Sequence, residues 1–332
     1  MFNLLLTGGN GFIGSNIILE LLKKKYVLKI IVVDNLSNSS IKNLLNLKKK
    51  CNEKLIFYKY NIANKEELKR IIQFHNINAV IHLASLKSIP QSEKFPGLYY
   101  YNNVIGSKVV FELIKEFKIK DLILSSSATV YGNPLYLPID ETHPTRAINN
   151  YAKNKIDIEN LLHKDEYFKN ECSVKVLRYF NPVGADVSGV FGDPIKSDST
   201  NLMPIILKAA RKKIPYVGIF GKDYPTDDGT PIRDYIHITD LALGHIRALE
   251  YKAKGISVFN IGTGIGYSVL DMILTFESIN KVKVDYKFLS RRKGDSAISF
   301  ANCDKAKSLL NFEADKTLSM MCKDSWNCKS NI

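Results

Sequence analysis

The sequence has few cysteines and no long apolar run, and each shortage argues against a class of protein. Its five cysteines, an odd number, are scattered without the CxxC spacing of a metal site, so reduced thiols and no bound metal are the simplest interpretation. No run approaches the ~20 consecutive apolar residues that a membrane-spanning helix needs. The chain opens with the strand-like FNLLLTG, which lacks the pattern of a signal peptide. We therefore expect a cytoplasmic protein with no membrane partner.

Charge is unbalanced, because 47 lysines and arginines face 33 acidic residues and give a formal net charge of +14. Lysine dominates this excess and lies in short runs such as KKK at 23–25 and 48–50, which are usually solvated faces. A basic average field attracts small anionic ligands as well as nucleic acid. Since there is neither a nucleic-acid-binding motif nor a concentrated basic stripe, we expect no nucleic-acid partner.

Apolar segments alternate with helical patterns in the first half of the chain. Segments that are apolar on both faces and separated by helices predict a doubly wound parallel sheet of the Rossmann type, an α/β fold covered on both sides. After about residue 181 the pattern becomes irregular and richer in Pro, Gly and Asp. We expect a nucleotide-binding domain at 1–180 and a smaller substrate-binding region at 181–332, partly interleaved with it. The predicted strands are 2–8, 28–34, 55–60, 78–84, 121–127 and 174–180.

A glycine-rich loop follows the first predicted strand. The sequence TGGNGFIG places Gly8, Gly11 and Gly14 between that strand and an amphipathic helix, where glycine lets the backbone approach a pyrophosphate at the helix N-terminus. Asp34 ends the next strand, 20 residues after Gly14, where a carboxylate can accept from a ribose 2′-hydroxyl and would repel a 2′-phosphate. The combination predicts NAD rather than NADP, although Asp34 read alone is an ordinary strand-end turn residue.

The stretch YAKNK at 151–155 puts a tyrosine and a lysine four residues apart on a predicted helix. That spacing stacks both side chains on one face, so the Lys155 ammonium can lie near the Tyr151 phenol or near a ligand beside it. A cation there would lower the pKa of Tyr151 from its usual value near ~10 and make it a more useful base. Taken alone, the pair also occurs by chance on solvated helix faces.

Several segments together closely resemble UDP-glucose 4-epimerases of the extended short-chain dehydrogenase/reductase family. The resemblance runs from Asn3 to about Trp326, and its RDYIH and YFNPVG segments are more specific than the glycine loop or the YxxxK pair. The segments that carry it are the glycine loop, SSSATVYG at 125–132, YAKNK at 151–155, LRYFNPVGA at 177–185, NLMP at 201–204, IFGKDYPTDDGTPIRDYIH at 219–237 and RRKGD at 291–295.

The resemblance implies the roles of individual residues. Tyr151 would be the catalytic acid/base, Lys155 would lower its pKa and hold the nicotinamide ribose, and Ser127 would bond the sugar 4-hydroxyl and Tyr151. Read alone, Ser127 is a strand-end hydroxyl satisfied by the backbone. NAD would contact Gly8, Gly11, Phe12, Ile13, Gly14, Asp34, Asn35, Asn61, Ile62, Leu83, Ala84, Lys87, Asn102, Ser125, Tyr151, Lys155 and Tyr179. The UDP-sugar would contact Lys87, Ser127, Ala128, Thr129, Tyr151, Asn181, Asn201, Leu202, Phe220, Arg233, Arg292, Asp295 and Ser299.

The activity implied by the resemblance is the interconversion of UDP-glucose and UDP-galactose. A hydride would pass from sugar C4 to tightly bound NAD and return to the other face of a transient 4-keto sugar. Two arginines, Arg233 and Arg292, suit a pyrophosphate because planar guanidinium groups match phosphate oxygens. The resemblance also implies a homodimer packed through helices near 100–116 and 151–167.

The chain departs from the family pattern at a few positions. Asn61 replaces an Asp that contacts adenine, which predicts weaker or altered adenine binding, and Ser85 replaces a usual Gly. Ser299 aligns with a position where a bulky Tyr restricts the sugar pocket in some members. Because Ser is small, we expect activity on UDP-N-acetylglucosamine and UDP-N-acetylgalactosamine as well, unless Ser299 faces solvent or Phe300 fills the space.

Two other functions share these motifs. A nucleotide-sugar 4,6-dehydratase uses the same fold and YxxxK pair, but such enzymes carry Asp-Glu where this chain has Ala128 and Thr129, which are poor general acids or bases. A non-catalytic NAD-binding sensor is also possible on this fold, because fold does not determine function. The intact set of Ser127, Tyr151 and Lys155 argues against the sensor.

Overall fold

The computed structural model describes residues 2–195, 200–292 and 294–328. Contacts divide the chain into two compact units, each built from three segments. Unit 1 contains residues 1–130, 145–178 and 242–259, and unit 2 contains residues 131–144, 179–241 and 260–332. The assignment of 181–332 to a UDP-sugar region stays a prediction, while the division itself shows that short segments before and after residue 180 exchange between the units.

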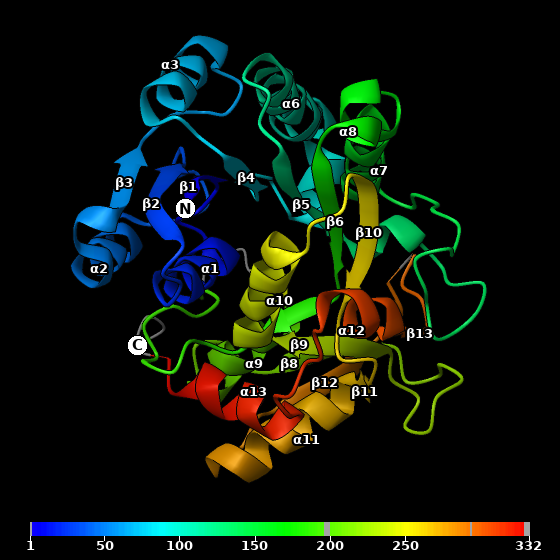
Figure 1. Ribbon diagram of the computed structural model, residues 1–332. Coiled ribbons are helices and arrows are strands. Elements are labelled where there is room, and N and C mark those ends of the chain that lie inside the picture. The colour runs from blue at the N-terminus through cyan, green and yellow to red at the C-terminus, as the bar shows by residue number, and fades with distance from the viewer. Residues whose placement is uncertain (1, 196–199, 293, 329–332) are drawn as a thin grey trace. The chain divides into compact units, whose positions relative to one another are not determined.

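A seven-stranded sheet forms the frame of unit 1 (Figure 1). Its order is β10-β6-β5-β4-β1-β2-β3, and the neighbours from β5 to β3 pair in parallel. All six predicted strands are confirmed, and β10 joins them from later in the chain. The strands are β1 (Phe2–Thr7), β2 (Val27–Val33), β3 (Leu55–Tyr58), β4 (Ala79–His82), β5 (Asp121–Ser127), β6 (Ser173–Tyr179) and β10 (Gly255–Ile261).

Helices alternate with these strands, which confirms the doubly wound α/β class. Their boundaries follow local chemistry: Asn64 caps α3 by accepting from the Glu67 N–H, and Asn149 caps α7 by accepting from the Ala152 N–H. The helices are α1 (Phe12–Leu22), α2 (Ile41–Cys51), α3 (Lys65–His75), α4 (Ile89–Lys94), α5 (Pro96–Tyr99), α6 (Gly106–Glu116), α7 (Asn150–His163), α8 (Glu166–Asn170) and α10 (Ile238–Glu250). Shorter turns are η1 (Asn52–Lys54), η3 (Ala128–Tyr131) and the π-helix η2 (Tyr100–Ile105).

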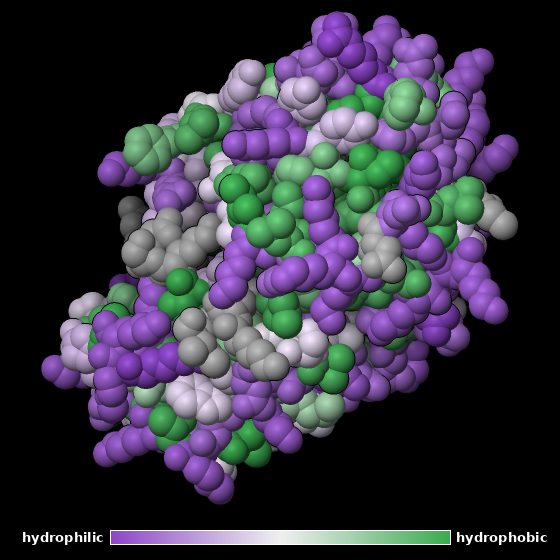
Figure 2. Space-filling view, turned by 90° about the vertical axis from the view of Figure 1, so that its left-hand side faces the viewer, coloured by the Kyte–Doolittle hydropathy of each residue, from purple (hydrophilic) through white to green (hydrophobic). Residues whose placement is uncertain are grey.

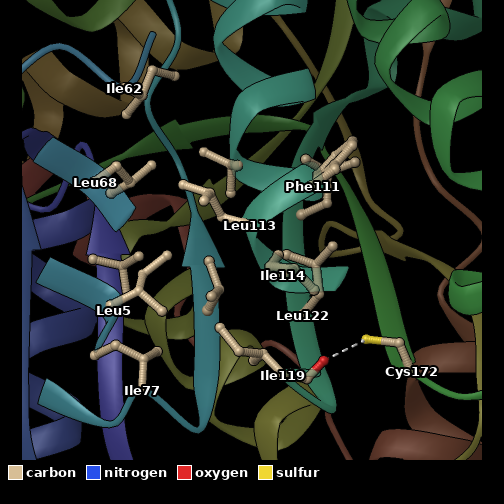
Figure 3. Packing of buried hydrophobic residues seen from close by; sticks show 14 of the residues in the cluster. Leu5, Ile62, Leu68, Ile77, Phe111, Leu113, Ile114, Ile119, Leu122 and Cys172 are labelled. Carbon is tan, nitrogen blue, oxygen red and sulfur yellow. Dashed lines mark hydrogen bonds between the residues drawn. The ribbon is translucent and has the colours of Figure 1, made fainter. Parts of the chain in front are cut away.

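The main core of unit 1 lies between one face of this sheet and helices α3, α6 and α7 (Figure 3). Leu5 and Leu122 come from the sheet, while Leu68 and Phe111 come from the helices, and each is almost fully buried. The Cys172 thiol faces the Ile119 carbonyl at 3.5 Å. Burial on both faces explains why the strands read as continuous apolar runs.

Lysine-rich α2 shows how the positive charge is carried. The helix buries Leu44, Leu47 and Cys51, while Lys48, Lys49 and Lys50 are exposed in its last turn. Figure 2 shows the face on the side of α2 and β3, where hydrophilic side chains cover most of the surface and cross a more apolar area. This run is therefore a solvated helix face, as its composition indicates.

Unit 2 contains two small sheets that pack with helices around a second core. β9 pairs with β11, β13 and β7, and β8 pairs in parallel with β12. The strands are β7 (Asn181–Val183), β8 (Val217–Phe220), β9 (Ile232–His237), β11 (Gly266–Ser268), β12 (Tyr286–Leu289) and β13 (Ile298–Ser299). The helices are α9 (Leu202–Ala210), α11 (Val269–Asn280), α12 (Asp304–Leu310) and α13 (Leu318–Trp326).

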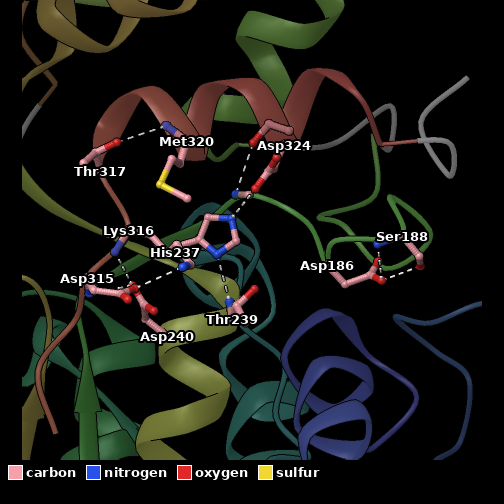
Figure 4. A network of polar contacts seen from close by, with 12 residues as sticks. Asp186, Ser188, His237, Thr239, Asp240, Asp315, Lys316, Thr317, Met320 and Asp324 are labelled. Atoms are coloured by element: carbon pink, nitrogen blue, oxygen red, sulfur yellow. Dashed lines mark hydrogen bonds and ion pairs between the residues drawn. The ribbon is translucent and has the colours of Figure 1, made fainter.

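A polar network ties the end of β9 to α13 and to the segment before it (Figure 4). The buried His237 ring accepts at Nδ1 from the Thr239 N–H, and its Nε2 lies 3.2 Å from an Asp324 oxygen. Asp240 accepts from the backbone N–H groups of Asp315 and Lys316, and burial raises its pKa. These contacts hold the C-terminal helix against the central strand of unit 2.

Among the described residues, no helix combines the length and apolar character needed to cross a membrane. Within the same residues, acidic, cysteine and histidine side chains form no group of three or more that could hold a metal ion.

Candidate functional site

The glycine loop leaves no room for side chains where β1 turns into α1. A Cβ on Gly8 would lie 2.8 Å from the backbone of Ala84, and one on Gly14 would lie 2.6 Å from Gly9. Gly8 also has a φ of +70°, which favours glycine. Gly11 caps α1 without a side-chain bond, and Phe12 and Ile13 begin the helix. The free N–H groups of this first turn suit a phosphate.

Asp34 lies beside the loop at the end of β2. Its side chain accepts from the Asn10 N–H at 3.1 Å, the Leu36 N–H at 2.8 Å and the Ser39 hydroxyl at 3.0 Å. Asn35 continues this turn by accepting from the Ser37 N–H. A carboxylate has about four lone-pair sites, so Asp34 is both fixed in place and able to accept from a ribose. The glycine cradle and this carboxylate fit an NAD cofactor.

Asn61 and Ile62 follow β3. Asn61 Oδ1 accepts from the Ala63 N–H at 2.9 Å, so the oxygen expected to face adenine already has a partner within its own turn. Ile62 is buried against Gly106, where a Cβ would come within 2.6 Å of the Ile62 side chain. The α6 helix therefore begins in direct contact with this segment.

The segment after β4 brings together three more predicted cofactor residues and one that sequence reasoning missed. Leu83 and Ala84 donate to the Thr7 carbonyl and hydroxyl at 3.1 and 3.3 Å. Asn103, in the π-helix, accepts from the Leu86 N–H and donates to the Leu86 carbonyl. Its neighbour Asn102 donates to the Asn103 side chain.

These two hydrogen bonds between the Asn103 side chain and the Leu86 backbone fix the chain just before Lys87. Only the position of Asn103 next to Asn102 could have suggested them from sequence.

The predicted reacting groups meet where β5 ends and α7 begins. Lys155 is buried, and its Nζ donates to the Ser125 carbonyl at 2.8 Å and lies 5.8 Å from the centre of the Tyr151 ring. Thr129 donates its N–H and hydroxyl to the Ser127 hydroxyl oxygen at 3.3 and 3.0 Å. Ala128 and Thr129 form the turn η3 directly after the strand.

The electrostatics of this group differ from the simple expectation. Burial raises the pKa of Tyr151 to about 12, and a side-chain hydrogen bond with Ser127 acts in the opposite direction. Burial also lowers the pKa of Lys155 to about 8, against the effect of the Glu159 carboxylate. Tyr151 is therefore a weak acid in the protein alone, and any lowering of its pKa by Lys155 stays a prediction.

Predicted substrate residues in unit 2 occupy three places. Arg233 in β9 lies in register with Ser299 in β13 and donates to the Ile232 carbonyl at 2.8 Å. The Arg292 guanidinium carbon lies 3.6 Å from the centre of the Phe220 ring. A guanidinium stacked on an aromatic face keeps its N–H groups available to an anion. Asp295 donates its N–H to the Arg292 carbonyl at 3.4 Å, which closes a turn.

The remaining predicted residues are held by other parts of unit 2. Asn181 donates to the Asp234 carbonyl at 2.9 Å, and Asn201 donates to Asp193 at 3.1 Å directly before Leu202 begins α9. Tyr179 ends β6 and is largely buried. Sequence reasoning missed Asp234, whose buried carboxylate accepts four hydrogen bonds from Thr263, Gly264 and Ala301.

A buried histidine links the strands beneath the glycine loop. Thr7 and His82 are register partners in β1 and β4, and the Thr7 hydroxyl lies 2.6 Å from His82 Nδ1. His82 Nε2 lies 2.8 Å from the Ser107 hydroxyl, which itself donates to the Asn103 carbonyl. Since Ser107 uses its proton there, it accepts from His82, whose hydrogen lies on Nε2; burial lowers the pKa of His82 to about 3, so the ring is neutral.

The fold and site define a dinucleotide-binding protein with a tyrosine and lysine pair at the same sheet edge as the glycine loop. A model of the NAD dependent epimerase/dehydratase family matches residues 4–262, and the chain belongs to that family.

A Bacillus subtilis UDP-glucose 4-epimerase is 43% identical over 98% of this chain and 96% of its own length. The crystal structure of a UDP-glucose-4-epimerase from Stenotrophomonas maltophila, with bound NAD and formylated UDP-arabinopyranose, aligns with a TM-score of 0.94. It is 37% identical and covers 98% of this chain and 97% of that one. One from Bifidobacterium longum, in complex with NAD+ and UDP, aligns with a TM-score of 0.93 at 38% identity, over 98% of both chains. These findings confirm the expected resemblance, the NAD cofactor and an NAD-dependent isomerase.

The neutral His82 predicts a pH-dependent stability. Burial and the nearby Lys155 charge lower its pKa to about 3, whereas an unfolded histidine has a pKa of about 6.5. Only the unfolded chain takes up this proton between these values, so the stability is present above about pH 6.5 and is lost as the pH falls. Between pH 7.5 and 5.0, the free energy of unfolding of the wild type should fall by about 2 kcal/mol more than that of His82→Gln.

Denaturant unfolding at a series of pH values measures this difference. The exposed His163 offers the matched control, because His163→Gln should follow the wild-type curve. Parallel curves for wild type and His82→Gln would contradict the neutral, buried histidine.

Proposed function

We propose that the protein is a UDP-glucose 4-epimerase that interconverts UDP-glucose and UDP-galactose through a transient 4-keto sugar. The observation that carries the proposal is the assembly of Ser127, Tyr151 and Lys155 at the end of β5, on the same sheet edge as a glycine loop that fits NAD. The full-length similarity to UDP-glucose 4-epimerases supports the same assignment. We also place the enzyme in the cytoplasm, because Cys51, Cys172, Cys303 and Cys322 are thiols rather than halves of a disulfide, as a reducing compartment favours.

In this proposal the chain supplies proton transfer and position. Tyr151 removes the proton of the sugar 4-hydroxyl, and Ser127 holds that hydroxyl and the phenol in line. Lys155 keeps a positive charge beside them, which stabilises a phenolate. Bound NAD supplies the hydride acceptor and donor. Arg233 and Arg292 hold the pyrophosphate, and this remote binding energy positions the sugar and keeps the keto intermediate from leaving.

A dehydratase is the alternative within the family. Elimination of water requires further acid and base groups, but Ala128 and Thr129 follow Ser127, and the Thr129 hydroxyl is engaged with the Ser127 oxygen. The proposal therefore favours epimerisation.

The first test is to incubate the purified protein, with no added cofactor, with UDP-glucose and to identify products by NMR. We expect UDP-galactose, and we expect Tyr151→Phe to lower the rate by at least about 10²-fold, because the proton acceptor is lost. Retained NAD, measured after denaturation, should be equal in both proteins.

No epimer even after addition of NAD, or a fully active Tyr151→Phe variant, would overturn the assignment. A 4-keto-6-deoxy product would indicate the dehydratase.

We also propose that the enzyme accepts UDP-N-acetylglucosamine. Ser299 is half-buried in β13 and in register with Arg233, and it offers only a hydroxymethyl group. The neighbouring Phe300 ring packs against Gly266, where an added Cβ would lie 3.4 Å from the ring. Because the ring is placed there, it supports the view that the space beside Ser299 is open.

Substitution of Ser299→Tyr should reduce turnover of UDP-N-acetylglucosamine at least about tenfold, because a bulky ring would meet the acetyl group, with UDP-glucose turnover changed less than about twofold. Ser299→Ala is the control and should retain both activities. Coupled assays with the two sugars measure the ratio. Wild-type turnover confined to UDP-glucose would refute the wider specificity.

A homodimer is the assembly that we propose. Leu98, Tyr100 and Tyr101 expose 57%, 48% and 54% of their surface directly before α6, on elements that contact α7. Exposed apolar and aromatic side chains of this kind suit an isologous interface. Sedimentation should give twice the mass of the chain, and Tyr100→Lys/Tyr101→Lys should give the monomer. The control Phe74→Lys, at another exposed aromatic residue, should remain dimeric. A wild-type monomer would contradict the proposal.

A further inference from the structure

A buried carboxylate lies on α7 one turn beyond Lys155. Tyr151, Lys155 and Glu159 follow one another at intervals of four residues, so they share one face of the helix. Glu159 exposes only 4% of its surface, as does Lys155. Charged side chains are rarely buried this deeply unless they are paired. The partners of Glu159 therefore indicate what it is for.

Two strands hold the carboxylate from the sheet side. Ser126 in β5 donates its hydroxyl to Glu159 Oε1 at 2.5 Å. Arg178 in β6 donates from Nε to Oε1 at 3.2 Å and from Nη2 to Oε2 at 2.6 Å. A two-pronged guanidinium bond of this kind fixes the plane of the carboxylate as well as its charge.

The same strand also holds Lys155. Its Nζ donates to the carbonyl of Ser125, the residue next to Ser126. Adjacent residues of β5 thus set the positions of the ammonium and of the carboxylate behind it. Burial disfavours the charged form of Lys155 and lowers its pKa to about 8, and the Glu159 carboxylate is the charge that opposes this shift.

Other charged or titratable groups surround this row. Tyr99 contributes to the raised pKa of Tyr151, and Arg178 pairs with Glu159. The Lys155 charge contributes to the lowered pKa of His82 at the end of β4. His82 is neutral, and an arginine stays charged throughout the working pH range. Removal of the Glu159 charge would leave the buried Arg178 guanidinium without its carboxylate and would remove the charge that favours the ammonium form of Lys155.

We propose that Glu159 is a positioning residue for proton transfer: fixed by Ser126 and Arg178, its carboxylate keeps Lys155 charged and directed toward Ser125 and Tyr151. This inference rests on the proposed epimerase function for its catalytic consequence. Its physical content, the coupling of Glu159 to the protonation of Lys155, is independent of the substrate.

The test replaces Glu159→Gln, which keeps the size and an acceptor oxygen for Ser126 but removes the charge. The Lys155 ¹⁵N signal, assigned by its absence in Lys155→Met, reports titration in the purified protein. We expect its midpoint to move at least one pH unit lower, which is a factor of about ten in the proton equilibrium. Asp157→Asn, a half-buried carboxylate on the same helix, is the matched control and should leave the midpoint in place.

Activity supplies the second measurement. The ammonium form is the useful one, so kcat of Glu159→Gln should fall at least about fivefold at pH 8 and stay within about twofold of wild type at pH 6, with KM for UDP-glucose unchanged. If the single variant does not fold, Glu159→Gln/Arg178→Gln removes both halves of the buried pair and is measured instead, with a smaller shift in the same direction expected because the arginine charge is removed as well.

An unchanged Lys155 midpoint, or a loss of kcat that is equal at all pH values, would overturn the proposal and leave Glu159 a purely structural partner of Arg178. If the wild-type protein epimerises no UDP-glucose, the proposed function fails, while the Lys155 titration still decides the coupling.

Discussion

The close approach of β1 to β4 is the constraint on which the cofactor end of the fold depends. Gly8 turns against the backbone of Ala84 with no space for a Cβ, and the Thr7 hydroxyl joins the Ala84 N–H to His82. His82 passes the chain of hydrogen bonds to Ser107 and so to the start of α6. One buried polar path therefore sets where the glycine loop and the segment after β4 leave the sheet.

From this constraint the other groups follow by strand order. In parallel sheets the carboxyl ends of neighbouring strands share one edge, where ligands bind. Asp34 follows β2, Ala84 follows β4 and Ser127 ends β5, so three residues from distant parts of the sequence occupy that edge. The adjacent serines of β5 then anchor Lys155 and Glu159 on α7. Backbone register thus places the reacting groups, and the buried charges tune them.

The sequence predicts the parts of this arrangement that local pattern determines. The strands of the sheet are continuous apolar runs, and the glycine loop and YxxxK pair carry their spacing in a few residues. The hydrogen bonds of Asn103 to Leu86, of His82 to Ser107 and of Glu159 to its two partners could not be foreseen. Each joins residues that are 17 or more positions apart in the sequence. The assignment of residues 242–259 to unit 1 also depends on contacts between distant parts of the sequence, because no local pattern in that segment indicates which strand it pairs with.

In unit 2 the strand β9 pairs with three others, and its side chains alternate between the two faces of the sheet. Arg233 and Asp234 are neighbours, so their side chains point to opposite faces of the strand. Asp234 accepts from Thr263, Gly264 and Ala301, and burial raises its pKa while these four donors oppose that effect. Ala301 lies two residues after Ser299, so this carboxylate fixes the register that sets Ser299 beside Arg233. A slip of one residue would turn both side chains to the wrong face. Because the frame is fixed in this way, a change of residue at 299 acts through its size rather than by moving the strand that carries it.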